Sequence, residues 1–493
     1  MTEHEKIFFD ILRSALWGTP IKVPHKVDWS AVMKLAKTQA LMGLVANVLL
    51  TNGEIRSSLP AELISKLRNI PMTNLATHTQ MNLTLQRLTL SLREAGIEPV
   101  LLKGQGLARN YPIPELRQCG DIDLYVGEEC YERTYEALLP IVSEIDDKAK
   151  IWNWMHFDAK IGNIMLEVHQ KADYMRSRKG DKLYREYMRR GLSENLSPIK
   201  FADTDVMTPN DTYNAFYVFY HLWRHFSGTG VGLRQFCDWT CFLHTHVGKL
   251  DLPYLKEMLV NLGFMKPWQV FGCFLVKDLG LPEEEFPFYN PKYLRKVERV
   301  RDYVMKDGNF GVLTGYSRVR KHSYIKEKWF SFKCHMLRIG RMFMIFPKQT
   351  ILHVWYVFRD GLVQMFMVGL AFPVGSDLFH DHALVFGGDD EGGLFALVEV
   401  GQHFAVEVAV DFRIEDAVAA ELAHAAGEEL VGGDVHGDLF GNVLQSLGPA
   451  EGEKLAFGGH HGFGEELGAF HVHMRHGELD TVEDLVDALT TFA

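Results

Sequence analysis

The sequence predicts an α+β protein in which a small mixed β-sheet is flanked by helices. Two short apolar runs with β-branched residues, 99–103 and 121–126, are typical of strands. A Gly-x-Gly turn follows the first run, and two aspartates open the second. Stretches before and after this pair carry apolar residues at helical spacing, which predicts helices on both sides of the sheet in the sequence.

The first 96 residues are predicted to form a helical platform. Asp28 is a candidate N-cap within it, and Gly96 a candidate C-cap at its end. The strand at 99–103 then leads through the glycine turn into a short helix at 107–110. The helices expected in the platform are 4–17, 29–50, 60–70 and 73–95.

The two aspartates of the second strand point to one face of the sheet. Because residues i and i+2 of a strand share a face, Asp121 and Asp123 project side by side, with Ile122 and Leu124 turned into the core. Two carboxylates about 6–7 Å apart repel each other, and a bound cation relieves that repulsion. Hard oxygen donors suit Mg²⁺, and Mg²⁺ beside a glycine turn is typical of phosphoryl or nucleotidyl transfer. The alternative is a solvated strand start with two acids at the sheet edge.

A third carboxylate is expected on a neighbouring strand. After a predicted helix at 130–142, residues 152–160 and 163–169 alternate like two paired strands that turn at Gly162. Glu167 and His169 share the polar face of the second of these strands. Glu167 could ligate a metal ion or accept the proton of an attacking group, or it could be a solvated strand residue.

Together these segments resemble the uncharacterised nucleotidyltransferase family of the DNA polymerase β superfamily, whose members occur in bacteria. The motifs are Leu-Leu-Lys-Gly-x-x-Leu-Ala, a following Tyr-Pro and Arg, Asp-Ile-Asp-Leu, Leu-Glu-Val-His, His-Leu-Trp-Arg-His and Gly-Leu-Arg-Gln-Phe-Cys-Asp. The resemblance covers about residues 1–350. It implies a small mixed sheet, two Mg²⁺ ions, and attack on the α-phosphate of an NTP with release of pyrophosphate.

The resemblance also implies roles for individual residues. Asp121, Asp123 and Glu167 would be the catalytic carboxylates and metal ligands. The nucleotide-binding set would be Lys103, Gly104, Gln105, Gly106 and Arg117, with backbone amides of the turn facing the triphosphate. For Lys103 and Arg117 an ordinary surface or salt-bridge role remains the alternative.

Two departures from the superfamily pattern motivate a second hypothesis. Gln105 follows Gly104 where the superfamily prefers Ser or Gly, and the gap from Gln105 to Asp121 is longer than usual. A non-catalytic module that binds a nucleotide or a partner without turnover is therefore the alternative function. For an enzyme, the acceptor would be a sugar phosphate, an RNA or a protein.

A helical segment at 213–246 supplies further candidates. His221 and His225 are four residues apart and share a helix face, but no further ligand follows at metalloprotease spacing. Packed or acceptor-facing histidines are therefore expected rather than half of a metal site. Arg234 and Asp238 are also four residues apart, and a structural ion pair is expected, with placement near the active cleft as the alternative. The candidate residues on the acceptor side are His169, His221, His225, Arg234 and Asp238.

The charge balance changes sharply near residue 370. Residues 371–493 contain three basic and 24 acidic residues, whereas residues 1–370 contain 49 basic and 39 acidic ones. The segment after 370 resembles translation of the wrong strand of a GC-rich gene, and our hypothesis is a frameshift or fusion artefact without a packed core. The predicted domains are a helical platform (1–96), a nucleotidyltransferase core (97–200), a helical domain (201–370) and this acidic segment (371–493).

Two other features bear on location and partners. The six cysteines are scattered without a Cys-x-x-Cys pair, and residues 1–6 lack the apolar core of a signal peptide, so a cytoplasmic protein is expected. The apolar stretch 351–372 is interrupted by Arg359 and Asp360, which favours a buried helix over a membrane span, with a surface-lying amphipathic helix as the alternative. Residues 292–341 interleave basic and aromatic side chains that could contact RNA or an anionic membrane surface, the alternative being a solvated helical face.

Overall fold

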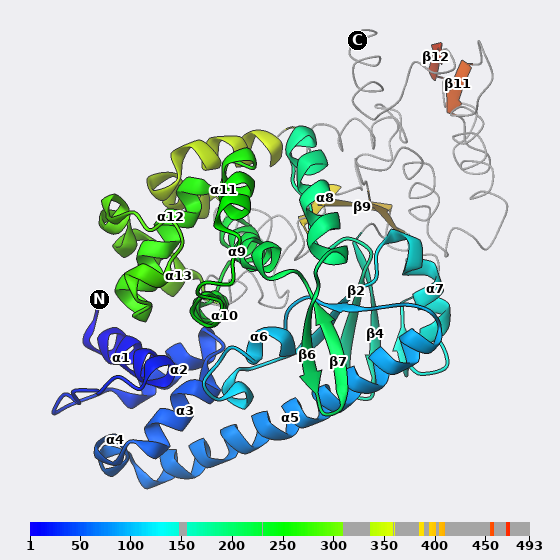
Figure 1. Cartoon of the computed structure of the whole chain (residues 1–493). Helices are drawn as coiled ribbons and strands as arrows, with labels where there is room; N and C mark the ends of the chain where they lie inside the picture. The colour runs from blue at the N-terminus through cyan, green and yellow to red at the C-terminus, as the bar shows by residue number, and fades with distance from the viewer. Residues whose placement is uncertain are drawn as a thin grey trace. The chain divides into compact units, whose positions relative to one another are not determined.

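The computed structural model describes residues 1–146, 155–228, 230–308, 336–357 and 359, together with five strands between residues 384 and 473. The chain divides into two units, Met1–Ile351 and Leu352–Ala493. Helices α1 to α13 and strands β1 to β7 belong to the first unit (Figure 1).

The first unit begins with a helical region and continues into the sheet. The helical region comprises α1 (Glu3–Trp17), α2 (Trp29–Thr38), α3 (Met42–Thr51), α4 (Gly53–Ser58) and α5 (Ala61–Glu94). The sheet region comprises β1 (Val100–Leu101), α6 (Gln105–Ala108), the 3₁₀ turn η1 (Pro114–Leu116), β2 (Asp121–Tyr125), α7 (Glu128–Leu138), β3 (Glu144–Ile145), β4 (His156–Ile161), β5 (Ile164–His169), α8 (Arg178–Ser193), β6 (Ser197–Phe201) and β7 (Thr204–Thr208).

A second helical region follows the sheet. It comprises α9 (Asp211–Ser227), α10 (Leu233–Thr245), α11 (Leu252–Asn261), α12 (Met265–Phe274), the π-helical turn η3 (Leu275–Leu279), the 3₁₀ turns η4 (Glu283–Glu285) and η5 (Pro291–Lys296), and α13 (Val297–Asp307). Residues 336–345 and 347–357 are helical as well.

The sheet of the first unit is mixed, as predicted, and the α+β class is confirmed. In the described part of the chain it has seven strands in the order β3-β4-β5-β2-β1-β7-β6. Strand β2 pairs antiparallel with β1 and parallel with β5, while β4 and β5 form the predicted hairpin through Gly162, whose φ is 61°. The pair β6–β7 lies beyond the strands that sequence patterning indicated, and β7 joins the sheet by pairing parallel with β1.

One face of the sheet is covered by α5 and α7. Ile122 and Leu124 of β2 are fully buried on this face, as the alternation of the strand predicts. They belong to a hydrophobic cluster that also contains Leu85, Leu88 and Leu92 of α5, Tyr131 and Tyr135 of α7, and Leu166 and Val168 of β5. Since neighbouring residues of a strand alternate in direction, the side chains of Asp121 and Asp123 point to the opposite face.

Two of the predicted helix boundaries are wrong. The helix expected over 29–50 is broken into α2 and α3 at Ala40, which adopts a φ of 54°. Gln39 is buried at this break, where its side chain accepts a hydrogen bond from the Leu233 amide and donates one to the Val304 carbonyl. Conversely, the two helices expected over 60–95 form one helix, α5, that continues through Pro71.

The helical stretch expected over 213–246 is likewise two helices, α9 and α10. Both contribute aromatic side chains to a second hydrophobic cluster, in which Phe219, Trp239 and Trp268 are fully buried and pack edge to face or tilted. This packing holds the second helical region as one body against α1 to α3.

The second unit contains two small antiparallel sheets among its described residues. They consist of β8 (Leu384–Gly388), β9 (Leu394–Val400) and β10 (Phe404–Ala409), and of β11 (Lys454–Phe457) and β12 (Phe470–His473). The rest of 371–493, on which the artefact hypothesis depends, lies outside the described residues, as do 358 and 360–372 of the apolar stretch. Within the described residues no single helix has the length and apolar composition to cross a bilayer; the bent pair Leu252–Asn261 and Met265–Leu279 meets both criteria together.

Gly191 on α8 provides a test of the packing between α8 and α9. A Cβ atom at this position would lie 2.0 Å from Cγ of the buried Tyr213. Because neither backbone can yield without disturbing the cluster, we expect Gly191→Ala to lower the free energy of unfolding by about 1–3 kcal/mol in urea denaturation. Gly53→Ala is the control, since a Cβ there meets no atom within 4 Å; equal loss in both variants would contradict this packing.

Candidate active site

The three predicted carboxylates lie together where β2 runs beside β5. In the parallel register of these strands, Asp123 is the direct partner of Glu167, and Asp121 is the partner of Met165. One oxygen of each of Asp121, Asp123 and Glu167 lies within 4.8 Å of the others. The local alternation of two neighbouring strands therefore brings three acids to one face of the sheet.

Asp123 is the most strongly held of these acids. It is 2% exposed, and its Oδ1 lies 2.9 Å from Nζ of Lys103 and 3.3 Å from Nε2 of His169. Burial alone would raise the pKa of Asp123, but the positive charge of Lys103 and the hydrogen bond with His169 outweigh it and hold the pKa far below its usual range. Asp123 is therefore ionised, with Lys103 as its partner.

Among the described residues, neither Asp121 nor Glu167 has a lysine or arginine partner as close as Lys103 is to Asp123. The charge of Asp123, followed by burial, raises the pKa of Asp121 against the opposing charges of Lys103 and Arg234. Burial, followed by the charge of Asp123, raises the pKa of Glu167, although His169 Nε2 lies 3.4 Å from its Oε2. The cluster thus carries more negative charge than its neighbours balance, and its oxygen donors fit a hard divalent cation such as Mg²⁺.

The glycine turn lies against the backbone of β2 at Asp121. Gly104 has a φ of 53° and precedes α6, and a Cβ on it would lie 3.2 Å from the backbone oxygen of Asp121. At Gly106 a Cβ would make ordinary contacts at 3.4 and 3.5 Å. The side chain of Gln105 is 1% exposed and donates to the Met81 sulfur at 3.1 Å. Gly104 and Gly106 are buried as well, so the nucleotide contact predicted for this turn stays a prediction.

Arg117 forms a salt bridge with Asp238, a residue far from it in the sequence. Its Nε lies 2.7 Å from Asp238 Oδ1 and its Nη2 2.8 Å from Oδ2, and both side chains are buried. The Tyr111 hydroxyl donates to the same carboxylate at 2.6 Å. The predicted ion pair between Arg234 and Asp238 is therefore wrong. Asp238 forms a bidentate salt bridge with Arg117, which is distant in the sequence, instead of pairing with Arg234 on its own helix.

Arg234 instead lies close enough to Asp121 for its charge to lower the pKa of that carboxyl. Its Nη1 donates to the Gln118 backbone oxygen at 3.0 Å, and its positive charge acts on Asp121. Its buried Nε has no hydrogen-bond partner among the described residues. Of the two arginines singled out from the sequence, Arg234 thus retains hydrogen-bonding capacity at the cluster, whereas Arg117 has a structural salt bridge.

Helix α9 brings the predicted acceptor-side histidines to the same region. Nε2 of His221 and Nε2 of His225 are 3.1 Å apart. Burial, followed by the positive charge of Lys103, lowers the pKa of His221 well below its usual value, which leaves its imidazole neutral at pH 7. Arg224 on this helix is 2.6 Å from Asp173, which follows β5. This pair links α9 to the carboxylate-bearing strand.

Sequence reasoning missed a cysteine next to the carboxylates. Cys119 Sγ lies 2.9 Å from Nη1 of Arg117 and 3.6 Å from Nε2 of His78 on α5. Burial raises the pKa of Cys119, but the charge of Arg117 and the hydrogen bond with His78 lower it further, so the net pKa is below its usual value. No spacing signal could reveal this cluster, because His78 is 41 residues away from Cys119.

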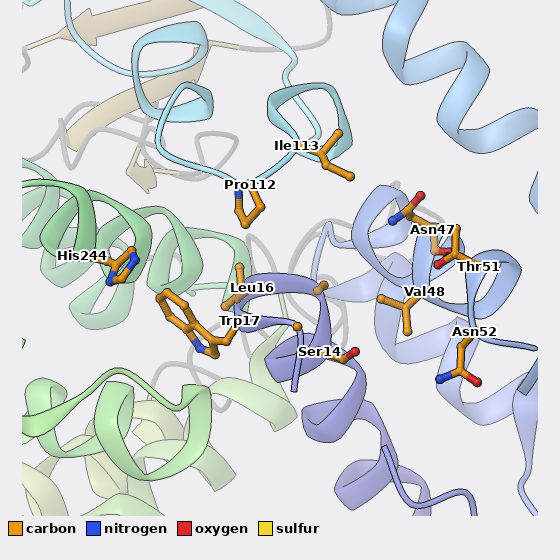
Figure 2. A pocket seen from close by; sticks show the side chains of 12 residues that line it. Ser14, Leu16, Trp17, Asn47, Val48, Thr51, Asn52, Pro112, Ile113 and His244 are labelled. Carbon is orange, nitrogen blue, oxygen red and sulfur yellow. Dashed lines mark hydrogen bonds between the residues drawn. The ribbon is translucent and has the colours of Figure 1, made fainter. Parts of the chain in front are cut away.

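A separate pocket lies away from the carboxylates. It has a volume of about 670 Å³. Figure 2 shows Trp17 of α1, Asn47 and Thr51 of α3, and His244 of α10 around it, with Pro112 and Ile113 along one side. None of its lining residues belongs to the predicted site, so this pocket is not the candidate active site.

The basic stretch 292–341 is described only in part. Arg301 forms a buried ion pair with Asp278, with both N···O distances 2.7 Å, and the buried Arg338 donates to the Gly228 backbone oxygen. These two arginines therefore stabilise the fold. Residues 309–335, which include the interleaved aromatic residues Tyr324, Trp329, Phe330 and Phe332, lie outside the described residues.

Comparison with known proteins identifies a family for this chain. A family model described as an uncharacterised nucleotidyltransferase matches residues 25–276, slightly more than half of the chain, and this range includes the whole sheet and all three carboxylates. No curated protein matches the chain. Among solved structures, an antigenic nucleotidyltransferase-like protein from Paracoccidioides brasiliensis matches with 12% identity and a TM-score of 0.27, over 43% of this chain and 96% of that one.

Asp123 has Lys103 as a close partner and Asp121 does not, so replacing each aspartate by asparagine should change the stability of the protein in opposite directions. Asp123→Asn removes the charge that balances Lys103, and we expect a loss of about 1–3 kcal/mol in the free energy of unfolding without metal.

The raised pKa of Asp121 means that its ionised form opposes folding once the pH exceeds that pKa, so Asp121→Asn should raise the melting temperature at pH 7. The advantage of Asp121→Asn should vanish below pH 3, where the wild-type carboxyl is protonated too. Thermal unfolding at pH 7 and pH 3 measures both effects, and a lower melting temperature for Asp121→Asn at pH 7 would contradict this account.

The environment of Cys119 predicts a reactive thiol. Because the lowered pKa keeps the thiolate populated at lower pH, we expect alkylation of Cys119 by iodoacetamide to persist further below neutrality than alkylation of Cys130. Cys130 is the internal reference because it is also partly exposed. Mass spectrometry of both cysteines between pH 6 and 9 gives the two profiles, and superimposable profiles would rule out the effect of Arg117 and His78.

Proposed function

Since the chain belongs to the uncharacterised nucleotidyltransferase family, we propose that it transfers a nucleoside monophosphate from an NTP to an acceptor and releases pyrophosphate. The observation that carries this proposal is the meeting of three carboxylates from adjacent parallel strands beside a glycine turn. A structural role alone would not require three acids on one face, because their mutual repulsion opposes folding.

Asp121, Asp123 and Glu167 are the residues that would hold Mg²⁺. Their donor atoms are all oxygens, and the raised pKa values of Asp121 and Glu167 express a charge imbalance that a divalent cation corrects. Mg²⁺ held there would supply electrostatic stabilisation of the attacking and leaving oxygens in phosphoryl chemistry.

The protein's own groups would orient the substrates. We assign Arg234 and the backbone of the Gly104–Gly106 turn to the triphosphate, because both lie beside Asp121. Glu167 is assigned to accept the proton of the attacking group, since its side chain is 24% exposed whereas Asp123 is buried. The acceptor, a sugar phosphate, an RNA or a protein, would enter past α9, where His221 and His225 lie.

The position of Lys103 supports a second candidate function, which is binding without turnover. Its ammonium group is 2.9 Å from Asp123 and already supplies a positive charge at the cluster. A chain in which this pair persists would bind a nucleotide or a partner without turnover. The proposed location for either function is the cytoplasm, where NTPs are available and thiols such as the five free cysteines of the described residues stay reduced.

Turnover with labelled NTPs tests the enzymatic function. The full-length chain with Mg²⁺, each NTP and a lysate-derived acceptor pool should release pyrophosphate and label an acceptor. We expect Asp121→Asn to lower this rate at least about 100-fold, because it removes a group that acts on charge in the transition state.

Asp203→Asn is the matched control, since it makes the same chemical change at an exposed position in the turn between β6 and β7. This variant should retain the wild-type rate. Saturable NTP binding without pyrophosphate release would favour the binding module, and full activity of Asp121→Asn would refute the enzymatic assignment.

A further inference from the structure

We propose that His156, Glu167 and His169 form a binding site for a transition-metal ion, next to the all-oxygen cluster. One donor atom from each of these residues lies within 4.8 Å of the others. His156 and His169 are direct partners in the antiparallel register of β4 and β5, and their rings are 5.0 Å apart. Glu167 stands two residues before His169 on the same face of β5.

The donor set distinguishes this site from the carboxylate cluster. Imidazole nitrogens are borderline ligands that favour ions such as Ni²⁺, Cu²⁺ or Zn²⁺, for which Co²⁺ is a spectroscopic substitute, whereas Mg²⁺ takes oxygen ligands almost exclusively. Two histidines and one carboxylate leave coordination positions open for water or a substrate oxygen. The site therefore selects a different class of ion from the one that suits Asp121 and Asp123.

The surroundings of both histidines fit metal ligation. His169 is 2% exposed, and its Nδ1 is a buried nitrogen without a hydrogen-bond partner in the described part of the chain. Its Nε2 is 3.3 Å from Asp123, and Nε2 of His156 is 3.3 Å from Asp158. A carboxylate on one ring nitrogen leaves the other ring nitrogen for a metal ion, and such carboxylates are common around metal sites. Asp158 is 47% exposed, which leaves this side of the hairpin open to solvent.

Glu167 belongs to both clusters and connects them. Its carboxylate has two oxygens, so one can face Asp121 and Asp123 while the other faces the histidines. The geometry thus points to two unlike ion positions that share one ligand. This inference concerns ion binding alone and holds whether or not the chain catalyses nucleotidyl transfer.

Cobalt binding in the presence of excess Mg²⁺ tests the proposal. The untagged full-length chain is saturated with Mg²⁺ and titrated with Co²⁺, with visible absorption and calorimetry as readouts. We expect Co²⁺ to bind despite Mg²⁺, and His156→Gln to weaken the tightest Co²⁺ site by at least about 10-fold. The Mg²⁺-induced rise in melting temperature should be the same in this variant, because the all-oxygen cluster is intact.

Two controls separate this site from other histidines. Residues 371–493 contain ten histidines that can also take up Co²⁺, so the difference between wild type and variant is the decisive quantity. His25→Gln, at an exposed position, should bind Co²⁺ as wild type does. Glu167→Gln should weaken both Co²⁺ binding and the Mg²⁺ effect, because it changes the shared ligand.

Pulsed EPR of wild type provides a measurement that needs no variant to fold. Cu²⁺ or Mn²⁺ in the tightest site should show coupling to two imidazoles. Complete displacement of Co²⁺ by Mg²⁺, unchanged Co²⁺ affinity in a folded His156→Gln variant, or absence of imidazole coupling would each overturn the proposal. None of these readouts uses an NTP, so failure of the transferase assay leaves the inference standing.

Discussion

The structure depends on the negative charge of three carboxylates that lie close together where β2 pairs with β5. Three carboxylates share one face of the sheet there; Lys103 is the close cationic partner of Asp123, and His169 contacts both Asp123 and Glu167. The hydrophobic cluster on the opposite face holds both strands in place, so the acids cannot move apart to relieve their repulsion. The carboxylates repel each other and the packing of their strands holds them in place, so the site is preorganised for cations.

The surrounding helices complete this site from distant parts of the chain. Helix α9 supplies His221 and His225, and α10 supplies Arg234 next to Asp121. The Arg117–Asp238 pair joins the loop before β2 to α10, and the Arg224–Asp173 pair joins α9 to the segment after β5. Both ion pairs connect one of these helices to a segment flanking a carboxylate-bearing strand.

The family resemblance and the mixed sheet inferred from the sequence are confirmed. The roles assigned to Asp121, Asp123 and Glu167 stay predictions, although the residues lie together. Helix boundaries were less predictable: Ala40 breaks a helix where apolar periodicity continues, and α5 passes through Pro71 where a break is expected. In both cases tertiary packing outweighs the local preference of a single residue.

The sequence by itself determined which residues share a strand face, because the two-residue period of a strand is a local property of the backbone. It thereby placed Asp121 beside Asp123, and Glu167 on the face of His169. Only the tertiary structure decided which charges pair. Asp238 pairs with Arg117, 121 residues away, rather than with Arg234 four residues away, and His156 comes to lie opposite His169 across a hairpin. Electrostatic partnership depends on distance in space, and the packing of whole elements sets that distance.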